Sequence, residues 1–310
     1  AQPMYGLVAS QVAEALSAAD IFVNATGGND TNDCKSATAA CETIQAAIGK
    51  ATAGNTISVA EGAYNEKVSI TKNLTLRGAD GATINGPANS LAIEVQAQNN
   101  VLTNVTISGF TVNAGANSRN VINVSNGTGP TNTFFRGNLL MQDLTINGNN
   151  APVGIGLMQT DGVTVDDVTI NGVKTGIEAV GATNLSVTNS TITGSAFAGI
   201  YVWNTTGYGP RNNTLNFTNN TLTGNTTGIK IDDARNVTID GGTITGGQSA
   251  ISAKDTQTLK INSVTMSEQS SSSNLAVVGL IGAVQYAEVT NNSITNAQSA
   301  GATAQAILLG

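Results

Sequence analysis

Short apolar triplets alternate with polar turns along this chain, and one six-residue phrase recurs about every 22 residues from position 105 to 295. The phrase reads hydrophobic-x-Asn/Asp/Gly-x-Thr-hydrophobic, with copies at 107–112, 141–146, 165–170, 187–192, 217–222, 239–244, 261–266 and 289–294. In each triplet the two outer residues face inward and the middle residue faces outward, as in a β-strand. A fixed period of this length predicts a solenoid, in which stacked repeats bury one continuous core.

Three columns of apolar residues line up when the copies are aligned at steps of about 22 residues. They hold Ile155, Ile177, Ile200, Ile229, Ile251 and Val278; Val165, Val187, Phe217, Ile239, Ile261 and Val289; and Ile170, Ile192, Leu222, Ile244, Met266 and Ile294. Three strands in each coil predict an all-β fold, a right-handed parallel β-helix with three sheets. The turn between the second and third strands carries residues that tolerate a left-handed backbone: Gly109, Asp143, Asp167, Asn189, Asn219, Gly241, Ser263 and Asn291.

The chain divides into three parts. Residues 1–20 form an apolar, Ala-rich extension, for which we expect either a helix over 7–18 or an extended arm. Residues 21–55 form a cap, in which a short amphipathic helix over 43–53 places Ile44, Ala47 and Ile48 on one face. Residues 56–310 form the parallel β-helix itself.

Residues 21–86 carry a set of motifs that resembles a known module. The motifs are Ile21-Phe22-Val23, Gly28-Asn29-Asp30, Cys34 with Cys41, Thr43-Ile44-Gln45-Ala46-Ala47-Ile48, Gly54-Asn55-Thr56-Ile57-Ser58-Val59, Glu61-Gly62-Ala63-Tyr64 and Leu74-Thr75-Leu76-Arg77-Gly78. Together they resemble the opening of secreted right-handed β-helix proteins of the pectin-lyase-like superfamily, which implies that the helix caps the first coil. That superfamily contains lyases, esterases, epimerases, adhesins and phage tailspikes, so the resemblance is specific for the fold and not for an activity.

Composition and charge exclude several classes of function. The net charge of −7 and the sequence pI near 4.5 argue against a nucleic-acid partner, which requires a basic surface. The absence of histidine excludes His-based catalysis, including the Gly-His-Gly motif of polygalacturonases. No apolar run reaches 18 residues, so no transmembrane helix is expected.

The two cysteines and the polar composition both favour a location outside the cytoplasm. Cys34 and Cys41 lie seven positions apart in a polar loop, which favours a disulfide; the alternative is two free thiols in a reducing compartment. The abundance of Thr and Asn and the low Lys content favour an extracellular or cell-surface protein.

Acids, bases and large aromatic residues converge at one place in the repeat. The candidate patch contains Glu178, Tyr201, Trp203, Lys230, Asp232, Asp233, Arg235 and Lys254. The column alignment stacks Glu178, Tyr201 and Lys230, and separately Trp203, Asp232 and Lys254. The favoured interpretation is a solvated charge ladder; the alternatives are a sugar- or partner-binding patch, with Trp203 and Tyr208 stacking on a ring, or a catalytic site.

Most Asn-x-Ser/Thr sequons follow from a repeat that places Asn at corners and Thr on strands. Three sequons that we assign to loops, at Asn126, Asn204 and Asn225, are the candidate glycosylation sites. The adjacent aromatic residues Phe134 and Phe135 interrupt the repeat and are expected either to fold back on the helix flank or to form a contact site.

The leading functional hypothesis is an extracellular structural subunit that assembles end to end. Residues 304–310 read as a strand and not as a polar cap, and the extension 1–20 of another copy is a candidate to cover this end, giving a filament. The alternative is a carbohydrate-binding adhesin, or a Ca²⁺-dependent polysaccharide lyase, acting through Tyr201, Trp203 and Asp232. An enzyme is the less expected outcome, and no cofactor is expected apart from Ca²⁺ if the protein is a lyase.

Overall fold

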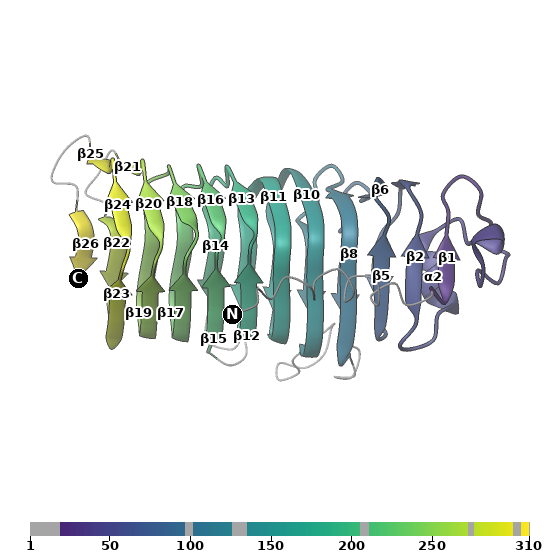
Figure 1. Cartoon of the computed structure of the whole chain (residues 1–310), viewed down its shortest axis with the longest axis horizontal. Coiled ribbons are helices and arrows are strands. Elements are labelled where there is room, and N and C mark those ends of the chain that lie inside the picture. The colour runs from purple at the N-terminus through teal and green to yellow at the C-terminus, as the bar shows by residue number, and fades with distance from the viewer. Residues whose placement is uncertain are drawn as a thin grey trace, which may run out of the picture.

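Short strands stack coil upon coil along the length of the molecule (Figure 1). The computed structural model describes residues 19–96, 102–125, 135–204, 211–271, 276–299 and 305–309. Every strand pairing among these residues is parallel, and each strand pairs with its equivalent in the next coil. The predicted all-β parallel β-helix is confirmed.

The strands of the first coils are β1 (Ile21–Val23), β2 (Thr56–Val59), β3 (Gly62–Tyr64), β4 (Val68–Ile70), β5 (Leu74–Gly78), β6 (Ala82–Asn85), β7 (Ile93–Gln96), β8 (Asn104–Asn113) and β9 (Asn120–Ser125). The middle strands are β10 (Phe135–Met158), β11 (Thr160–Val180), β12 (Thr183–Thr188), β13 (Thr191–Thr193), β14 (Ala198–Trp203), β15 (Asn213–Thr218), β16 (Thr221–Thr223) and β17 (Thr227–Asp240). The last strands are β18 (Thr243–Thr245), β19 (Ser249–Asn262), β20 (Thr265–Ser267), β21 (Ser270–Ser271), β22 (Ala276–Ile281), β23 (Tyr286–Thr290), β24 (Ser293–Thr295), β25 (Gln298–Ser299) and β26 (Gln305–Leu309).

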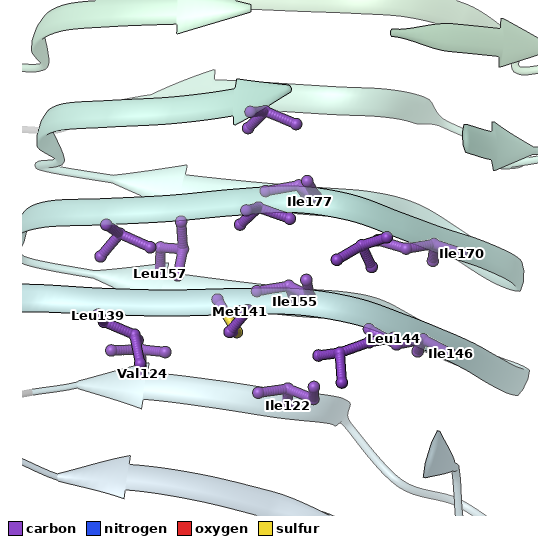
Figure 2. Packing of buried hydrophobic residues seen from close by; sticks show 14 of the residues in the cluster. Ile122, Val124, Leu139, Met141, Leu144, Ile146, Ile155, Leu157, Ile170 and Ile177 are labelled. Atoms are coloured by element: carbon purple, nitrogen blue, oxygen red, sulfur yellow. The ribbon is translucent and has the colours of Figure 1, made fainter. Parts of the chain in front are cut away.

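The three predicted apolar columns are present as register partners. In the first column Ile155 pairs with Ile177, and the pairing continues through Ile200, Ile229, Ile251 and Val278. Figure 2 shows Ile122, Ile155 and Ile177 following one another along the inside of the coils. Residues of this column are at most 1% exposed, as are Val187 and Phe217 in the second column. Burial of each such side chain stabilises the fold by roughly 1.5–3 kcal/mol.

The corners between the second and third strands have the backbone that the sequence predicted. All eight corner residues have a positive φ, from 51° at Asp143 to 78° at Gly109. Asn, Asp and Gly adopt this conformation at the lowest cost among common residues. The recurring polar position in the phrase is therefore a requirement of the turn.

The predicted amphipathic helix is present as α2 (Ile44–Lys50), and it covers the N-terminal end of the β-helix. Its buried residues Ile44, Ala47 and Ile48 face β1, β2 and β4. Thr43 caps the helix by accepting a hydrogen bond from the Ala46 amide, and the two oxygens of Glu66 accept from the Ile44 and Gln45 amides at 2.8 Å each. A short 3₁₀ helix, η1 (Ala37–Ala39), precedes it and was not predicted.

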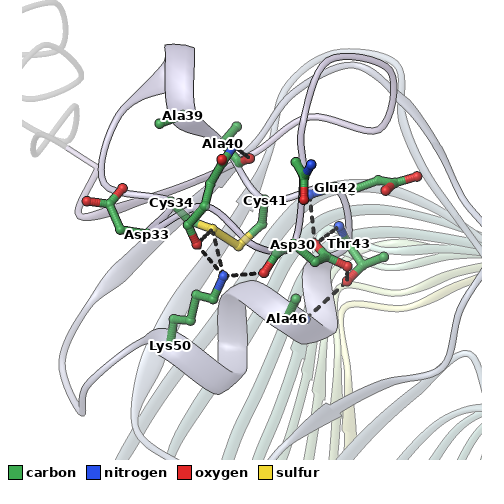
Figure 3. Close-up of a disulfide and its surroundings, with 12 residues drawn as sticks. Asp30, Asp33, Cys34, Ala39, Ala40, Cys41, Glu42, Thr43, Ala46 and Lys50 are labelled. Atoms are coloured by element: carbon green, nitrogen blue, oxygen red, sulfur yellow. Dashed lines mark hydrogen bonds between the residues drawn. A yellow bond between two sulfur atoms is a disulfide. The ribbon is translucent and has the colours of Figure 1, made fainter.

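Cys34 and Cys41 form a disulfide beside this cap, which confirms the first of the two cysteine interpretations (Figure 3). The Lys50 ammonium lies against the same loop, where it donates to the Asp30 and Asn32 carbonyls and lies 3.6 Å from the Cys34 sulfur. The loop, the disulfide and α2 therefore form one unit over the first coil.

We expect the double replacement Cys34→Ser and Cys41→Ser to destabilise this cap by about 2–3 kcal/mol, because closing a loop of this size restricts the unfolded chain. Thermal unfolding of both proteins, with and without dithiothreitol, measures the effect. Reductant should lower the melting temperature of the wild type toward that of the variant and leave the variant unchanged; a variant as stable as the oxidised wild type contradicts the prediction.

Several corner asparagines face the interior and bond back to the preceding coil. Asn225 is 2% exposed; its Oδ1 accepts from the Ser195 amide at 2.8 Å and its Nδ2 donates to the Ile192 carbonyl at 2.9 Å. The expectation that Asn225 is an accessible glycosylation site is therefore wrong, because its amide nitrogen is buried and used. Asn204 is half-buried, and its glycosylation remains a prediction.

Some expectations fall outside the described residues: the conformation of 1–18, Asn126, Phe134 and Tyr208. Among the described residues, no helix is long and apolar enough to cross a membrane.

Candidate functional site

The candidate patch lies on one outer face of the β-helix, formed by β14 and the adjoining parts of β11, β17 and β19. We call it the β14 face. The register aligns Glu178, Tyr201 and Lys230 in one outward column. Two residues further along each strand it aligns Trp203, Asp232 and Lys254 in a second column. Both alignments agree with the stacking that the repeat predicted.

Three aromatic side chains lie side by side on the β14 face. The Phe197 and Tyr201 rings meet edge to face with their centroids 5.0 Å apart. The Tyr201 and Trp203 rings are stacked, with centroids 6.2 Å apart and an interplanar angle of 17°. Phe197 is 41% exposed, so this aromatic surface is open to solvent on one side.

Two carboxylates fix the orientation of these rings. The Trp203 indole N–H donates to Glu178 Oε1 at 2.8 Å, and the Tyr201 hydroxyl donates to Asp232 Oδ2 at 3.1 Å. Lys230 completes the group, since its ammonium lies 2.9 Å from Asp232 Oδ2 and 5.6 Å from the centre of the Tyr201 ring. Each acid of the face is therefore engaged by a neighbour.

Burial and the negative charge of Asp232 raise the pKa of Tyr201 well above its ordinary value of 10.0, and the hydrogen bond to Asp232 and the charge of Glu178 act in the same direction. The phenol is therefore protonated at neutral pH. It serves as a hydrogen-bond donor and cannot serve as a general base there.

Two residues of the predicted patch lie away from the β14 face. Asp233 is at a turn, with a φ of 70°, and forms an ion pair with Arg211. Arg235 follows in the same turn region, with an exposed side chain and an amide that donates to the Asn212 carbonyl. The structure thus divides the predicted set into a group on the sheet and a group at a corner.

A groove of about 720 Å³ adjoins the aromatic surface, with Phe197, Trp203 and Glu178 on one of its walls. The rest of its lining is Leu91, Arg119, Asn120, Asn123, Pro152, Val153, Gly156, Leu157, Met158, Lys174, Thr175 and Val180. Apart from Glu178 and Trp203, none of these residues was predicted as part of a site. The 23-residue spacing of Lys174 and Phe197, each directly before a first-column strand, is the signal that could have revealed them.

The acids of the described residues do not gather as a Ca²⁺ site would require. Ca²⁺ takes six to eight oxygen ligands, several of them carboxylates. Among the described residues, no three His, Cys, Asp or Glu side chains are arranged to hold a metal ion. The β14 face is therefore better suited to binding than to metal-assisted cleavage.

Comparison with known families assigns the chain. The family described as a right-handed β-helix region matches residues 52–215, and the NosD family, described as a periplasmic copper-binding protein, matches residues 136–306. The chain belongs to both families. The resemblance of residues 21–86 to the pectin-lyase-like superfamily is thereby confirmed for this right-handed β-helix protein.

Solved structures of very different sequence share the fold of this β-helix protein. Tailspike protein 2 of bacteriophage CBA120 is 14% identical, with a TM-score of 0.68 over 86% of this chain and 44% of the tailspike domain. The A-module of the mannuronan C-5 epimerase AlgE4 from Azotobacter vinelandii is 14% identical, with a TM-score of 0.56 over 93% of this chain and 98% of the module. The polygalacturonase from Erwinia carotovora is 12% identical, with a TM-score of 0.53 over 94% and 97%.

These similarities establish the fold and not an activity. The β-helix protein spans 44% of the tailspike domain and 39% of the full-length tailspike, less than half of either. No protein with a curated description matches its sequence.

The copper in the description of the NosD family does not fit the residues of this β-helix protein. Proteins bind copper through imidazole, thiolate and thioether groups. The sequence has no histidine, and both cysteines are in the disulfide. Met141 and Met266 are fully buried, and Met158 is alone on the wall of the groove. The donor set for copper is therefore missing from the residues described.

Proposed function

We propose that this β-helix protein binds a polysaccharide at the β14 face and does not cleave it. The observation that carries the proposal is the aromatic surface of Phe197, Tyr201 and Trp203, which lies at the edge of a groove large enough for several sugar units. Sugar rings present apolar C–H faces that pack on aromatic rings, and their hydroxyl groups hydrogen-bond to nearby amides and carboxylates.

Preorganisation supports binding at this surface. The hydrogen bonds from Trp203 to Glu178 and from Tyr201 to Asp232 fix both rings before a ligand arrives. Less side-chain entropy is then lost when a ligand binds. The partners of this β-helix fold in other proteins, named as tailspikes, an epimerase and a polygalacturonase, are compatible with a polysaccharide ligand.

The chemistry of the face argues against cleavage. Asp232 is neutralised by Lys230, one oxygen of Glu178 accepts from Trp203, and the raised pKa of Tyr201 keeps its proton in place. A general acid and base pair needs two groups with pKa values tuned in opposite directions and access to the substrate. The described residues of the face do not supply such a pair.

We propose a location outside the cytoplasm, at a cell surface or in a periplasm. The disulfide is of the kind that persists in oxidising compartments, and the NosD family is described as periplasmic.

End-to-end assembly remains a separate prediction. Because α2 covers the N-terminal end, coils of two copies cannot stack directly there. Assembly would therefore depend on the extension 1–20, most of which lies outside the described residues.

The test of the proposed function uses Trp203, the single tryptophan of the chain, as its own reporter. Titration with a panel of neutral and acidic oligosaccharides is expected to change the tryptophan emission for at least one of them. The variant Trp203→Ala, followed by calorimetry, is expected to bind that ligand about 30-fold more weakly, the loss typical of a central aromatic contact.

The matched control is Tyr286→Ala, which removes an aromatic ring that is 53% exposed on β23, away from the groove. It should leave binding unchanged. If no oligosaccharide of the panel changes the emission, or if Trp203→Ala binds as tightly as the wild type, the proposal is wrong.

A further inference from the structure

One corner of the groove carries two cations and an aromatic ring in a line along the helix axis. The register partners Asn120, Val153, Thr175 and Ala198 lie on successive coils. The residues directly before them are Arg119, Pro152, Lys174 and Phe197, and all four line the groove. Backbone hydrogen bonds from the Val153 amide to the Arg119 carbonyl and from the Phe197 amide to the Lys174 carbonyl, at 3.2 and 2.8 Å, hold this line together.

Arg119 and Lys174 are exposed and take no part in the ion pairs of the described residues. By contrast, Lys230 and Lys254, on the same face, are paired with Asp232 and Asp255. Two coils separate the two unpaired cations, a distance of roughly 10 Å at the usual strand spacing. In a chain with a net charge of −7, this corner of the groove is locally positive, because its lining holds two cations and one carboxylate.

The floor of the groove is opened by Gly156, the residue between Asn123 and Glu178 in the outward column. A Cβ atom at position 156 would lie 2.4 Å from Asn120 Nδ2 and 3.2 Å from Asn123 Oδ1. The two amides therefore border the space over Gly156, and a 3.0 Å hydrogen bond between them fixes their orientation. That bond uses one polar atom of each amide, and leaves Asn120 Oδ1 and Asn123 Nδ2 for the hydroxyl groups of a ligand.

The single carboxylate of the groove is restrained. Glu178 accepts from the Trp203 indole N–H at 2.8 Å, so its charge is directed toward the aromatic wall. The cations approach from the opposite corner. An anionic group can therefore contact Arg119 and Lys174 while the ring that carries it lies over Gly156.

We infer that the hollow over Gly156 binds an anionic sugar unit of a polysaccharide, one that carries a carboxylate or a sulfate. Arg119 and Lys174 contact the anionic group, Asn120 and Asn123 bind hydroxyl groups, and the wall of Phe197 and Trp203 packs against the ring. This inference rests on the proposed function and names the ligand class of the same groove. The planar guanidinium of Arg119 suits a two-point contact with an oxyanion, and Lys174 supplies a second point charge.

The test compares three hexasaccharides by Trp203 emission and calorimetry: a galacturonate hexamer, a heparin-derived sulfated hexamer and cellohexaose. At least one of the anionic hexamers is expected to bind tenfold or more tightly than cellohexaose, with an affinity that falls as salt rises. The double variant Arg119→Gln and Lys174→Gln is expected to lose at least about tenfold in affinity for that hexamer, because charge-assisted contacts are removed. Its affinity for cellohexaose should not change.

The matched control is Lys254→Gln, which removes an exposed lysine of the same face outside the groove, and which should leave all affinities unchanged. Both variants alter exposed side chains, so circular dichroism should confirm an unchanged fold. If cellohexaose binds as tightly as both anionic hexamers, or if the double variant loses nothing, the anionic site is wrong while polysaccharide binding stands. If none of the three hexamers nor any other glycan binds, the proposed function fails as well.

Discussion

Replacing Phe217 by alanine is expected to lower the free energy of unfolding by about 3–5 kcal/mol. Phe217 is 1% exposed and is the largest fully buried side chain of the described residues. It fills the second column on β15, between Val187 and Ile239. Alanine would leave a cavity that the stacked coils on both sides cannot close, because each strand is held in register by its neighbours.

The control for this prediction is the same substitution at Phe197, which is 41% exposed and is expected to cost less than about 1 kcal/mol. Thermal unfolding measures the total effect. Hydrogen exchange shows where it falls, since coils of a solenoid contact only their neighbours and open locally. Exchange should increase in β12, β15 and the paired part of β17, and equal losses of stability in the two variants would contradict the assignment of the core.

Asn225→Ala is expected to destabilise the protein by roughly 2–4 kcal/mol, a large effect for a polar residue at a corner. The substitution leaves the Ser195 amide and the Ile192 carbonyl buried without their partner, and each unsatisfied group costs about 1–3 kcal/mol. Because Asn225 is 2% exposed, water cannot replace the lost amide unless the corner opens.

Asn236→Ala is the matched control for Asn225. Asn236 is an exposed asparagine whose Nδ2 bonds to Asn213 Oδ1 at 2.8 Å, so its loss should cost less than about 0.5 kcal/mol. Chemical denaturation of both variants gives the comparison. A similar small loss for both, or a glycan found on Asn225 by mass spectrometry of protein from a glycosylating host, would show that Asn225 is not held as described.

The architecture could be predicted from the sequence because a β-helix repeats a local rule. Inward positions in each triplet, such as Ile177 and Val187, are apolar, and each corner position, such as Asn189, has the residue that its φ of 52° requires. Once the period is known, the partners of every strand follow from counting. The stacking of Tyr201 on Lys230, and of Trp203 on Asp232, was predicted in this way.

The groove could not be predicted by the same counting. Its cations, Arg119 and Lys174, lie directly before strands, outside the aligned columns, and its hollow depends on Gly156, a position where the repeat places no side chain. The long segment between β9 and the register of β10 also hides the relation of Arg119 to Lys174 in the sequence.

Asn225 was misjudged for a different reason. A sequon in a polar turn suggests an exposed side chain, but this turn points its asparagine inward, where it bridges two coils. Whether a corner side chain faces in or out depends on the path of the neighbouring coil, which sequence spacing alone does not describe.

The in-register stacking of coils has a consequence for how such a protein can evolve. Duplication of one 22-residue coil would lengthen the molecule by about 4.8 Å and leave the pairing rules of every other coil intact. A change in the length of one turn, as between β14 and β15, where the step is 30 residues, is likewise absorbed locally. Recombination within the gene can therefore lengthen, shorten or re-line the binding surface one coil at a time, while the fold that supports it is inherited unchanged.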